Sequence, residues 1–220
     1  MKALSVSLGV ALLFCVLSVP AQNPPKQEKL LFENEYARVY EATLNPGESL
    51  QPHETGNRLI YSLSDYVLRY HWDNKVSEEK RKAGDVHFHP AGTHNEENGG
   101  KQKAVFLIVE RTSKALPAVE GSGHDMAKVS PYNTKVLLDR EQAKIFEVTL
   151  YPKDAVAMHF GLNRIVYGLT SYELVVKTPD GKEQKETHKK GSCDWQPAGM
   201  HTVENRGTQV AKFVVFSFKK

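Results

Sequence analysis

One stretch of the sequence occurs twice, and this internal duplication restricts the fold more than any other feature. The first copy reads GDVHFHPAGTHNEEN over residues 84–98, and the second reads GSCDWQPAGMHTVEN over residues 191–205. Seven residues recur in the same order at a constant offset of 107 positions. A fixed period of this length indicates two copies of one structural unit. Each copy predicts a strand, a Pro-x-Gly turn that favours a positive φ at the glycine, and a second strand that opens with a histidine.

The duplication extends beyond this stretch on both sides. Residues 45–61 match residues 151–167 at an offset of 106, so His53 and Arg58 correspond to His159 and Arg164. One extra residue therefore lies between the two matching blocks of the second copy. These matches predict a first repeat over residues 30–113, a linker over 114–130 and a second repeat over 131–220.

Both repeats are predicted to be all-β. Short segments rich in β-branched and aromatic residues alternate with turn signals, and no segment after the first 21 residues shows a period of 3.6. Many short strands with turns at regular spacing are typical of a sandwich or a barrel. Residues 105–109 and 213–218 are the most apolar of these expected strands.

Residues 1–21 have the pattern of a signal peptide. Lys2 is followed by an apolar run that ends near a small-residue cleavage site at Val19-Pro20-Ala21. The alternative is a retained membrane anchor. The run is short for a span, and residues 22–29 form a polar, proline-rich lead-in, which favours cleavage. Cleavage predicts a periplasmic or secreted chain with no membrane span and a flexible lead-in over residues 22–29.

Charge and cysteine content narrow the function further. The 29 Lys and Arg nearly balance the 26 Asp and Glu, and no dense basic face is evident, so nucleic acid is not an expected partner. Loss of the leader removes Cys15 and leaves Cys193 as the single cysteine, so no intrachain disulfide is expected. We interpret Cys193 as a buried small hydrophobic residue rather than a reactive thiol.

The duplicated motifs resemble those of the cupin superfamily. Residues 84–98 are close to the second cupin motif, although one residue instead of two separates the second glycine from the histidine. The spacing from Gly47 to His53 fits the start of the first cupin motif, and Lys153 replaces that glycine in the second repeat. The resemblance covers nearly the whole chain after the leader. It implies an all-β bicupin of two tandem double-stranded β-helix (jelly-roll) barrels, each with a pocket at its mouth.

The departures from the cupin pattern concern the metal ligands. The resemblance implies two His and one Glu from the first motif and one His from the second. Here the second His is replaced by Thr55 and Gly161, and an arginine stands at about the place of the Glu. Two histidines per repeat are too few to hold a metal well, and a guanidinium beside them would repel a cation.

The first repeat has further histidines that leave a metal site open as an alternative. His87 and His89 are two residues apart on an expected strand and so share a face. If that face points inward, His53, His89 and His94 form a three-His site for one divalent iron, manganese, zinc or nickel ion, with Glu96 or Glu97 nearby. In the second repeat Asp194 and Gln196 stand at the matching positions, and Trp195 and Met200 suggest pocket packing.

The recurrent histidine and arginine pair favours a metal-free ligand site. An inward arginine offers a planar donor fork that suits a carboxylate or a phosphate. The alternative is an internal salt bridge, in which Arg58 and Arg164 pair with Glu97 and Glu204, because buried charges need such partners. The predicted ligand-binding residues are His53, Arg58, His94, His159, Arg164 and His201.

Three functions are consistent with these residues. We expect an exported bicupin that binds a small polar or acidic ligand in the barrel mouth. The alternative is a metal-dependent enzyme of the dioxygenase, decarboxylase or isomerase type, with the metal in the first repeat only. A third interpretation is a structural protein that forms a homodimer through the apolar strands at 105–109 and 213–218. The fold alone does not choose among them.

Overall fold

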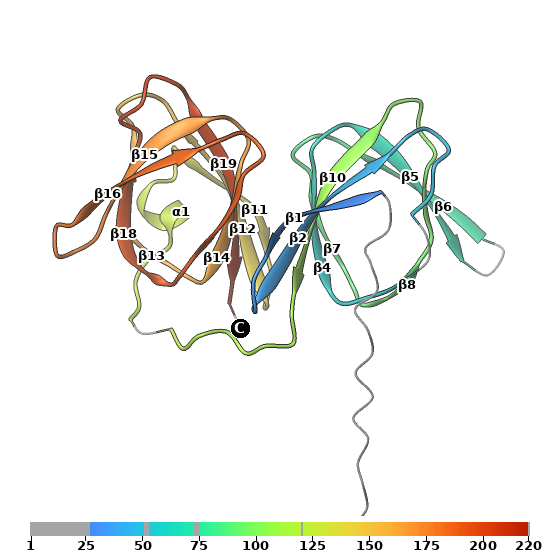
Figure 1. Cartoon of the computed structure of the whole chain (residues 1–220), viewed down its shortest axis with the longest axis horizontal. Helices are drawn as coiled ribbons and strands as arrows, with labels where there is room; N and C mark the ends of the chain where they lie inside the picture. Colours follow the sequence, from blue (N-terminus) through green and yellow to red (C-terminus); the bar gives the residue numbers. More distant parts are fainter. Residues whose placement is uncertain (1–26, 51–52, 73–74, 120, 220) are drawn as a thin grey trace, which may run out of the picture.

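The protein forms two β-barrels that lie side by side (Figure 1). The computed structural model describes residues 27–50, 53–72, 75–119 and 121–219, and of His53, Glu54, Thr55, Trp72 and His94 it describes only the backbone. The signal-peptide prediction and most of the predicted lead-in therefore lie outside the described residues. Within them, no helix is long and apolar enough to cross a membrane.

The first repeat contains ten strands in antiparallel sheets. A five-stranded sheet has the order β1-β2-β10-β4-β7, and β6-β5-β9 and the pair β3-β8 complete the barrel. The strands are β1 (Glu28–Glu33), β2 (Ala37–Leu44), β3 (His53–Thr55), β4 (Arg58–Ser62), β5 (Tyr66–Trp72), β6 (Lys75–Arg81), β7 (Val86–His89), β8 (Gly92–His94), β9 (Glu96–Asn98) and β10 (Ala104–Arg111).

The second repeat reproduces this arrangement. Its five-stranded sheet has the order β11-β12-β19-β14-β17, and β13-β18-β15-β16 forms the opposite wall. Even the β-bulge between Leu30 and Phe32 recurs, 106 residues later, between Val136 and Leu138. The strands are β11 (Thr134–Asp139), β12 (Ala143–Leu150), β13 (Ala155–Gly161), β14 (Arg164–Gly168), β15 (Tyr172–Lys177), β16 (Glu183–His188), β17 (Cys193–Gln196), β18 (Gly199–Glu204) and β19 (Ala211–Phe218).

The asparagine that ends each copy of the duplicated motif stabilises one turn of its barrel by hydrogen bonds. The Asn98 amide is fully buried and donates to the carbonyl oxygens of Leu44 and Gln102 at 2.9 and 2.8 Å. Asn205 makes the same two bonds, to Leu150 and Gln209. A buried backbone carbonyl without a partner is costly, so this amide is a structural requirement of the duplicated motif.

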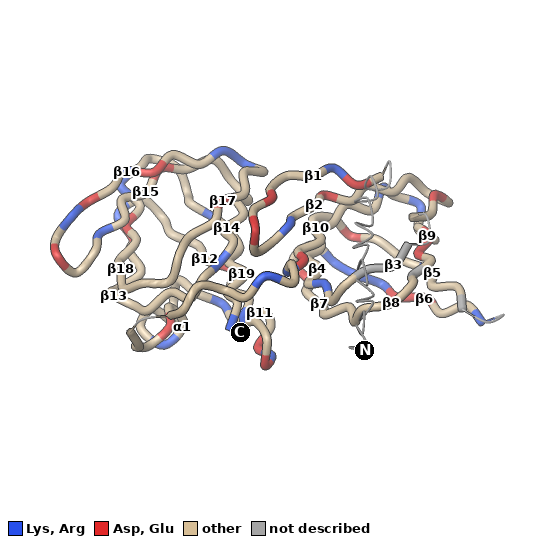
Figure 2. The backbone as a smooth tube through the Cα atoms, turned by 60° about the horizontal axis from the view of Figure 1, so that its bottom comes forward, with Lys and Arg blue, Asp and Glu red and all other residues tan. Residues whose placement is uncertain are grey.

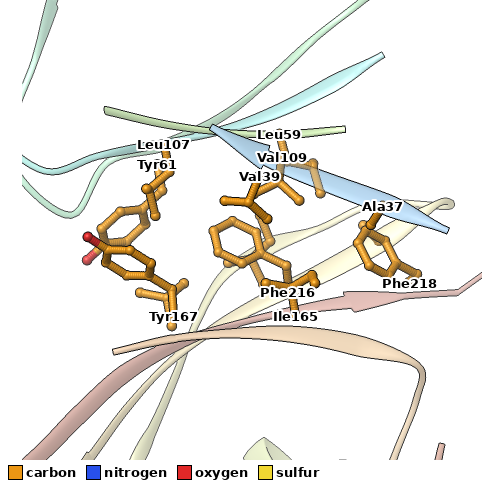
Figure 3. Close-up of a cluster of buried hydrophobic side chains, with 13 residues drawn as sticks. Ala37, Val39, Leu59, Tyr61, Leu107, Val109, Ile165, Tyr167, Phe216 and Phe218 are labelled. Carbon is orange, nitrogen blue, oxygen red and sulfur yellow. The ribbon is translucent and has the colours of Figure 1, made fainter. Parts of the chain in front are cut away.

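The two large sheets pack face to face and form a core between the barrels (Figure 3). On β10, Phe106 and Ile108 belong to the core inside the first barrel, whereas Leu107 and Val109 belong to the core between the barrels. The strand is apolar throughout because both of its faces are buried. The same division applies to β19, whose Val214, Phe216 and Phe218 face the first barrel.

This interface changes the interpretation of the apolar strands. Residues 105–109 and 213–218 were expected to supply the surface of a homodimer. Both are central strands of their sheets, and their outward faces are buried against each other within one chain. A homodimer would therefore have to use other surfaces. Figure 2 shows Lys and Arg interspersed with Asp and Glu along both barrels.

The segment predicted as a linker contributes to the second barrel. A single helical turn, α1 (Met126–Val129), is capped by the Asp125 side chain, which accepts a hydrogen bond from the Lys128 amide. Met126 is buried in the core of the second barrel. Cys193 is partly buried and packs against the core between the barrels, and burial raises the pKa of its thiol to about 12. A thiol with this pKa is unreactive, as expected from the sequence.

Candidate functional site

The second barrel encloses a small cavity lined by three of the predicted ligand-binding residues. His159 on β13, Arg164 on β14 and His201 on β18 face this cavity, whose volume is about 50 Å³. All three side chains are buried. His159 and His201 are directly opposite in the β13–β18 pairing, and their ring centroids are 4.2 Å apart. The duplicated motif thus brings its histidine to the earlier histidine, as predicted.

Both imidazoles are neutral and have the same tautomer. The Nδ1 atom of His201 lies 3.1 Å from the Gly199 carbonyl oxygen, and that of His159 lies 2.9 Å from the Ala157 carbonyl oxygen. Each Nδ1 therefore carries the proton and donates it to the backbone. Burial, with the nearby Arg164 charge, lowers the pKa of His201 to about 3, and burial also lowers the pKa of His159. Each Nε2 consequently presents a lone pair.

The two lone pairs have different surroundings. His201 Nε2 accepts a hydrogen bond from Arg164 Nη2 at 3.0 Å. His159 Nε2 is buried and has no hydrogen-bond partner among the described residues. An acceptor in this position favours a bound group that can donate a hydrogen bond, since a buried unpaired acceptor is unfavourable.

Arg164 hydrogen-bonds to several groups of the cavity wall and is the positively charged residue of the cavity. Its Nη1 atom donates to the carbonyl oxygens of Leu162 and Pro197 at 3.0 and 2.9 Å. Three of the five N–H donors are thus used within the protein. No carboxylate of the described residues lies within salt-bridge distance of this guanidinium. Burial lowers the pKa of Arg164 to about 10, opposed by the more distant Glu186, so the group remains charged at neutral pH.

This donor set does not fit a metal ion. Three histidines line the cavity, but His188 is hydrogen-bonded to Glu186 and Asp194. The guanidinium of Arg164 occupies the lone pair of His201 that a metal would need. A divalent cation at this point would also meet the Arg164 charge. The expectation of a poorer metal site in the second repeat is consistent with this geometry.

The cavity is also bordered by a hydrogen-bonded acid–histidine cluster from β16 and β17, which the sequence analysis missed. His188 lies between two carboxylates, with Nε2 3.1 Å from Glu186 and Nδ1 3.0 Å from Asp194. The bond to Glu186 is the main reason that the pKa of His188 is raised. The Tyr172 ring packs 4.8 Å from His188, and its hydroxyl has no partner among the described residues. Tyr66 and Tyr172 recur at the repeat offset, which was the available sequence signal.

The first barrel places a different set of charges at the matching position. Arg58 is only 1% exposed, and its Nη2 donates to His89 Nδ1 at 3.1 Å. The same Nη2 lies 3.5 Å from the Glu96 carboxylate, which is also 3.5 Å from His89 Nε2. Arg58, His89 and Glu96 therefore form one buried, charge-balanced group.

His87 and His89 share the inward face of β7, whereas Phe88 between them contacts the core between the barrels. Burial, together with the Arg81 and Arg58 charges, lowers the pKa of His87 to about 4. Both ring nitrogens of His89 already face charged neighbours, so a metal would have to displace Arg58 to use its Nδ1. The backbone of β3 and β8 places His53 directly opposite His94, as His159 is opposite His201.

The side chains of His53 and His94 lie outside the described residues. The three-His site of His53, His89 and His94 therefore stays a prediction. Among the side chains that the structure does describe, no three His, Cys, Asp or Glu residues are grouped to hold a metal.

The expected salt bridges involve other partners. Arg58 pairs with Glu96 instead of Glu97, whose carboxylate contacts Arg69 and His71 at 3.4 and 3.0 Å. Alternation along β9 explains the error, because Glu96 points inward and Glu97 outward.

The second repeat departs further from the expected pairing. Glu204 pairs with Arg206, and the residue that corresponds to Glu96 is Val203. Arg58 therefore has a carboxylate within 4.0 Å, whereas Arg164 has only the more distant Glu186 among the described residues. Trp195 also differs from expectation, since it lies at the interface between barrels, stacked on Tyr36 at 5.3 Å.

Comparison with known proteins supports the fold. No protein-family model and no curated protein matches the sequence. Among solved structures, AerE from Microcystis aeruginosa has a TM-score of 0.66 at 14% identity, covering 91% of this chain and 95% of that chain. A variant of oxalate decarboxylase from Bacillus subtilis has a TM-score of 0.60 at 15% identity, covering 90% and 76%. The coconut allergen cocosin has a TM-score of 0.60 at 12% identity, covering 82% and 76%.

These likenesses extend over both barrels of the chain. The protein has the cupin fold, as the motif resemblance predicted. At identities of 12–16% the comparison concerns architecture, and the function has to be argued from the site.

Proposed function

We propose that the protein is an exported two-barrel cupin protein that binds a small anionic ligand in the cavity of the second barrel. The observation that supports this most directly is the buried Arg164 charge, which has no carboxylate partner within 4.0 Å among the described residues. A buried charge without a counter-ion is unfavourable, and a bound anion would remove this cost. The signal-peptide pattern at residues 1–21 supports export.

The size and polarity of the cavity define the ligand class. Its volume of about 50 Å³ is roughly a third of the ~150 Å³ that holds benzene in an engineered cavity, so only a few heavy atoms fit. The two remaining N–H groups of Arg164 suit a carboxylate. The unpaired lone pair of His159 Nε2 suits a hydroxyl donor. A short hydroxy acid provides both groups.

Binding of glycolate, measured by isothermal titration calorimetry with the purified chain, tests this proposal. Acetate lacks the hydroxyl and glycolamide lacks the charge, so both are expected to bind more weakly. Val203→Glu places a carboxylate at the position that Glu96 holds in the first barrel, and it should abolish glycolate binding. Val203→Leu is the matched control and should retain binding. Equal binding of glycolate and glycolamide, or unchanged binding by Val203→Glu, would refute an anion site at Arg164.

The second candidate is a metal-dependent enzyme with its metal in the first barrel. The observation that favours it is the backbone pairing of His53 with His94 in the same barrel as the buried Glu96 carboxylate. One of the structural neighbours is named as a decarboxylase. Elemental mass spectrometry of the purified chain decides this point. About one iron, manganese, zinc or nickel per chain, lost in His94→Ala, would support the enzyme, and no metal after incubation with each ion would exclude it.

A further inference from the structure

A second cavity lies outside both barrels, at one end of the interface between them. Its volume is about 310 Å³, which is within the range of small-molecule pockets. Leu59 and Val109 from the first barrel and Ala143 and Phe218 from the second form an apolar floor. This cavity is separate from the barrel cavities and contains none of the residues predicted from the cupin motifs.

The two repeats are related by pseudo-symmetry, and at the position equivalent to this cavity three aromatic rings pack together. Beside this cavity, Tyr36 stacks on Trp195 with ring centroids 5.3 Å apart, and Trp195 stacks at 6.0 Å on Phe218, which also lines the cavity. The interplanar angles are 25° and 21°, so the three rings form one continuous stack. We call this group the aromatic stack.

The repeat offsets assign a counterpart to each ring of the aromatic stack. Tyr36 corresponds to Gln142, Trp195 to Phe88 and Phe218 to Arg111. All three counterparts line the cavity. The cavity is thus the position of an aromatic stack in which only the middle ring remains, and the place of the outer tyrosine ring is held by a glutamine side chain that is largely exposed to solvent.

Two guanidiniums, which have no acidic partner in the described part of the chain, complete the site. Arg111 Nη2 donates to the Lys114 carbonyl oxygen at 3.3 Å, but its Nε is buried without a hydrogen-bond partner in the described part of the chain. Burial lowers the pKa of Arg111. Arg140 lies over the Phe88 ring, 5.9 Å from its centroid. Neither arginine forms an ion pair with any described carboxylate.

We propose that this cavity is a second ligand site, which binds a small aromatic carboxylate. The ring of the ligand stacks on Phe88, in the place that corresponds to the Tyr36 ring on Trp195 in the aromatic stack. The carboxylate pairs with the Arg111 fork, whose Nε then gains a partner, and Arg140 contributes the second positive charge. An apolar floor with two convergent cations selects an amphipathic anion over a neutral ring or a fully polar acid.

Calorimetric titration of the purified chain with benzoate tests the site. Benzoate is expected to bind, benzamide to bind much more weakly because it lacks the charge, and cyclohexanecarboxylate to bind more weakly because it cannot stack. Arg111→Gln should weaken benzoate binding about tenfold or more, since it removes a charged hydrogen bond. Arg206→Gln is the matched control, because Arg206 is exposed and bound to Glu183 and Glu204, and it should leave binding unchanged.

Gln142→Tyr provides a test that does not depend on removing a charge. The new ring should complete a second aromatic stack on Phe88, block benzoate binding and leave the fold intact, as shown by circular dichroism. Val203→Glu changes the cavity of the second barrel and should leave benzoate binding unchanged. The proposal for the interface cavity can therefore be refuted separately from the proposal for the barrel cavity. No benzoate binding by the folded chain, or binding by Gln142→Tyr and Arg111→Gln equal to that of the unsubstituted chain, would overturn the proposal.

Discussion

Acidification from about pH 7.5 to about pH 4.5 should destabilise the protein through its buried neutral histidines. His201 is the clearest case. Its Nδ1–H donates to the Gly199 carbonyl oxygen, and its Nε2 accepts from Arg164, so there is no room for a second proton. The groups that face it are Arg164, His159 and, across the cavity, the Glu186–His188 pair. Protonation of His201 would place two positive charges in contact.

The magnitude follows from the pKa of His201, which is lowered from 6.5 to about 3 in the folded protein. Between these values the unfolded chain binds a proton that the folded protein does not bind, so stability falls as the pH falls. Each pH unit costs about 1.36 kcal/mol per histidine. Over the roughly two units from 6.5 to about 4.5, His201 contributes a loss of about 3 kcal/mol. His87, with a pKa of about 4, adds a similar loss of about 3 kcal/mol.

His188 has the opposite sign but acts in another pH range. Because its folded pKa is raised, its contribution is fully present below about 6.5 and is lost only as the pH rises through the folded value. It therefore does not offset the loss below pH 6. Asp125 and Asp139 have lowered pKa values, so their contributions are lost mainly below the range considered.

Urea unfolding at a series of pH values measures this effect. The free energy of unfolding should fall between about pH 6 and pH 4.5, and in His201→Gln the slope should be smaller by about 1.4 kcal/mol per pH unit. The slope is the informative quantity, because the substitution also changes the absolute stability. His124→Gln removes an exposed linker histidine and should leave the slope unchanged. A free energy of unfolding that is constant over this range, or equal slopes in the two variants, would contradict a buried neutral His201.

Four substitutions test other parts of the structure by chemical denaturation. Lys153 has a φ of 77° at the position where the first repeat has Gly47 at 76°. Lys153→Gly should therefore raise the free energy of unfolding by about 0.5–1 kcal/mol. A decrease would show that the turn is not strained. Phe216→Ala should cost about 3–5 kcal/mol and lower a single shared transition of both barrels; two separate transitions would show that the interface does not couple them. Glu96→Gln leaves the buried Arg58 without its counter-ion and should lower the free energy of unfolding by about 3 kcal/mol. Glu204→Gln removes a carboxylate from an exposed pair and should lower it by under about 1 kcal/mol. Similar losses of stability in the two variants would refute the difference in burial.

The fold could be predicted because the duplication repeats local signals that act over short distances. The Pro-x-Gly turn, the opening histidine and the closing asparagine each have a local role, such as the two carbonyls that Asn98 satisfies. Residues with such roles recur together whenever the unit is duplicated. The pairing of His159 with His201 follows from the same register and was also predictable.

The partners of the charged residues could not be predicted, because they depend on which side of a short strand each residue faces. Glu96 and Glu97 are adjacent in sequence, and only the register of β9 decides that Glu96 meets Arg58. The interface between the barrels was missed for a related reason. An apolar strand such as β10 shows that both faces are buried, but the sequence does not tell whether the second face meets the other repeat or another chain.

Some residues are the same in both repeats, and others differ. Residues needed by the barrel itself are retained in both copies, as with Asn98 and Asn205. The residues that differ between the repeats instead change the charge inside each barrel. Glu96 corresponds to Val203, and Arg164 has no carboxylate within 4.0 Å among the described residues, the more distant Glu186 being on the same cavity.

At the interface, each repeat differs from the other at one position of the aromatic stack. Phe218 of the second repeat corresponds to Arg111 of the first, and Tyr36 of the first corresponds to Gln142 of the second. A cavity lies at these positions, beside two arginines that have no carboxylate partner among the described residues. Both differences place an arginine without a carboxylate partner among the described residues next to a cavity, a small one inside the second barrel and a larger one at the interface. Arg164 is buried, whereas Arg111 is only partly buried. The cost of an unpaired charge, which the proposed anions would remove, is therefore expected to be larger at Arg164 than at Arg111.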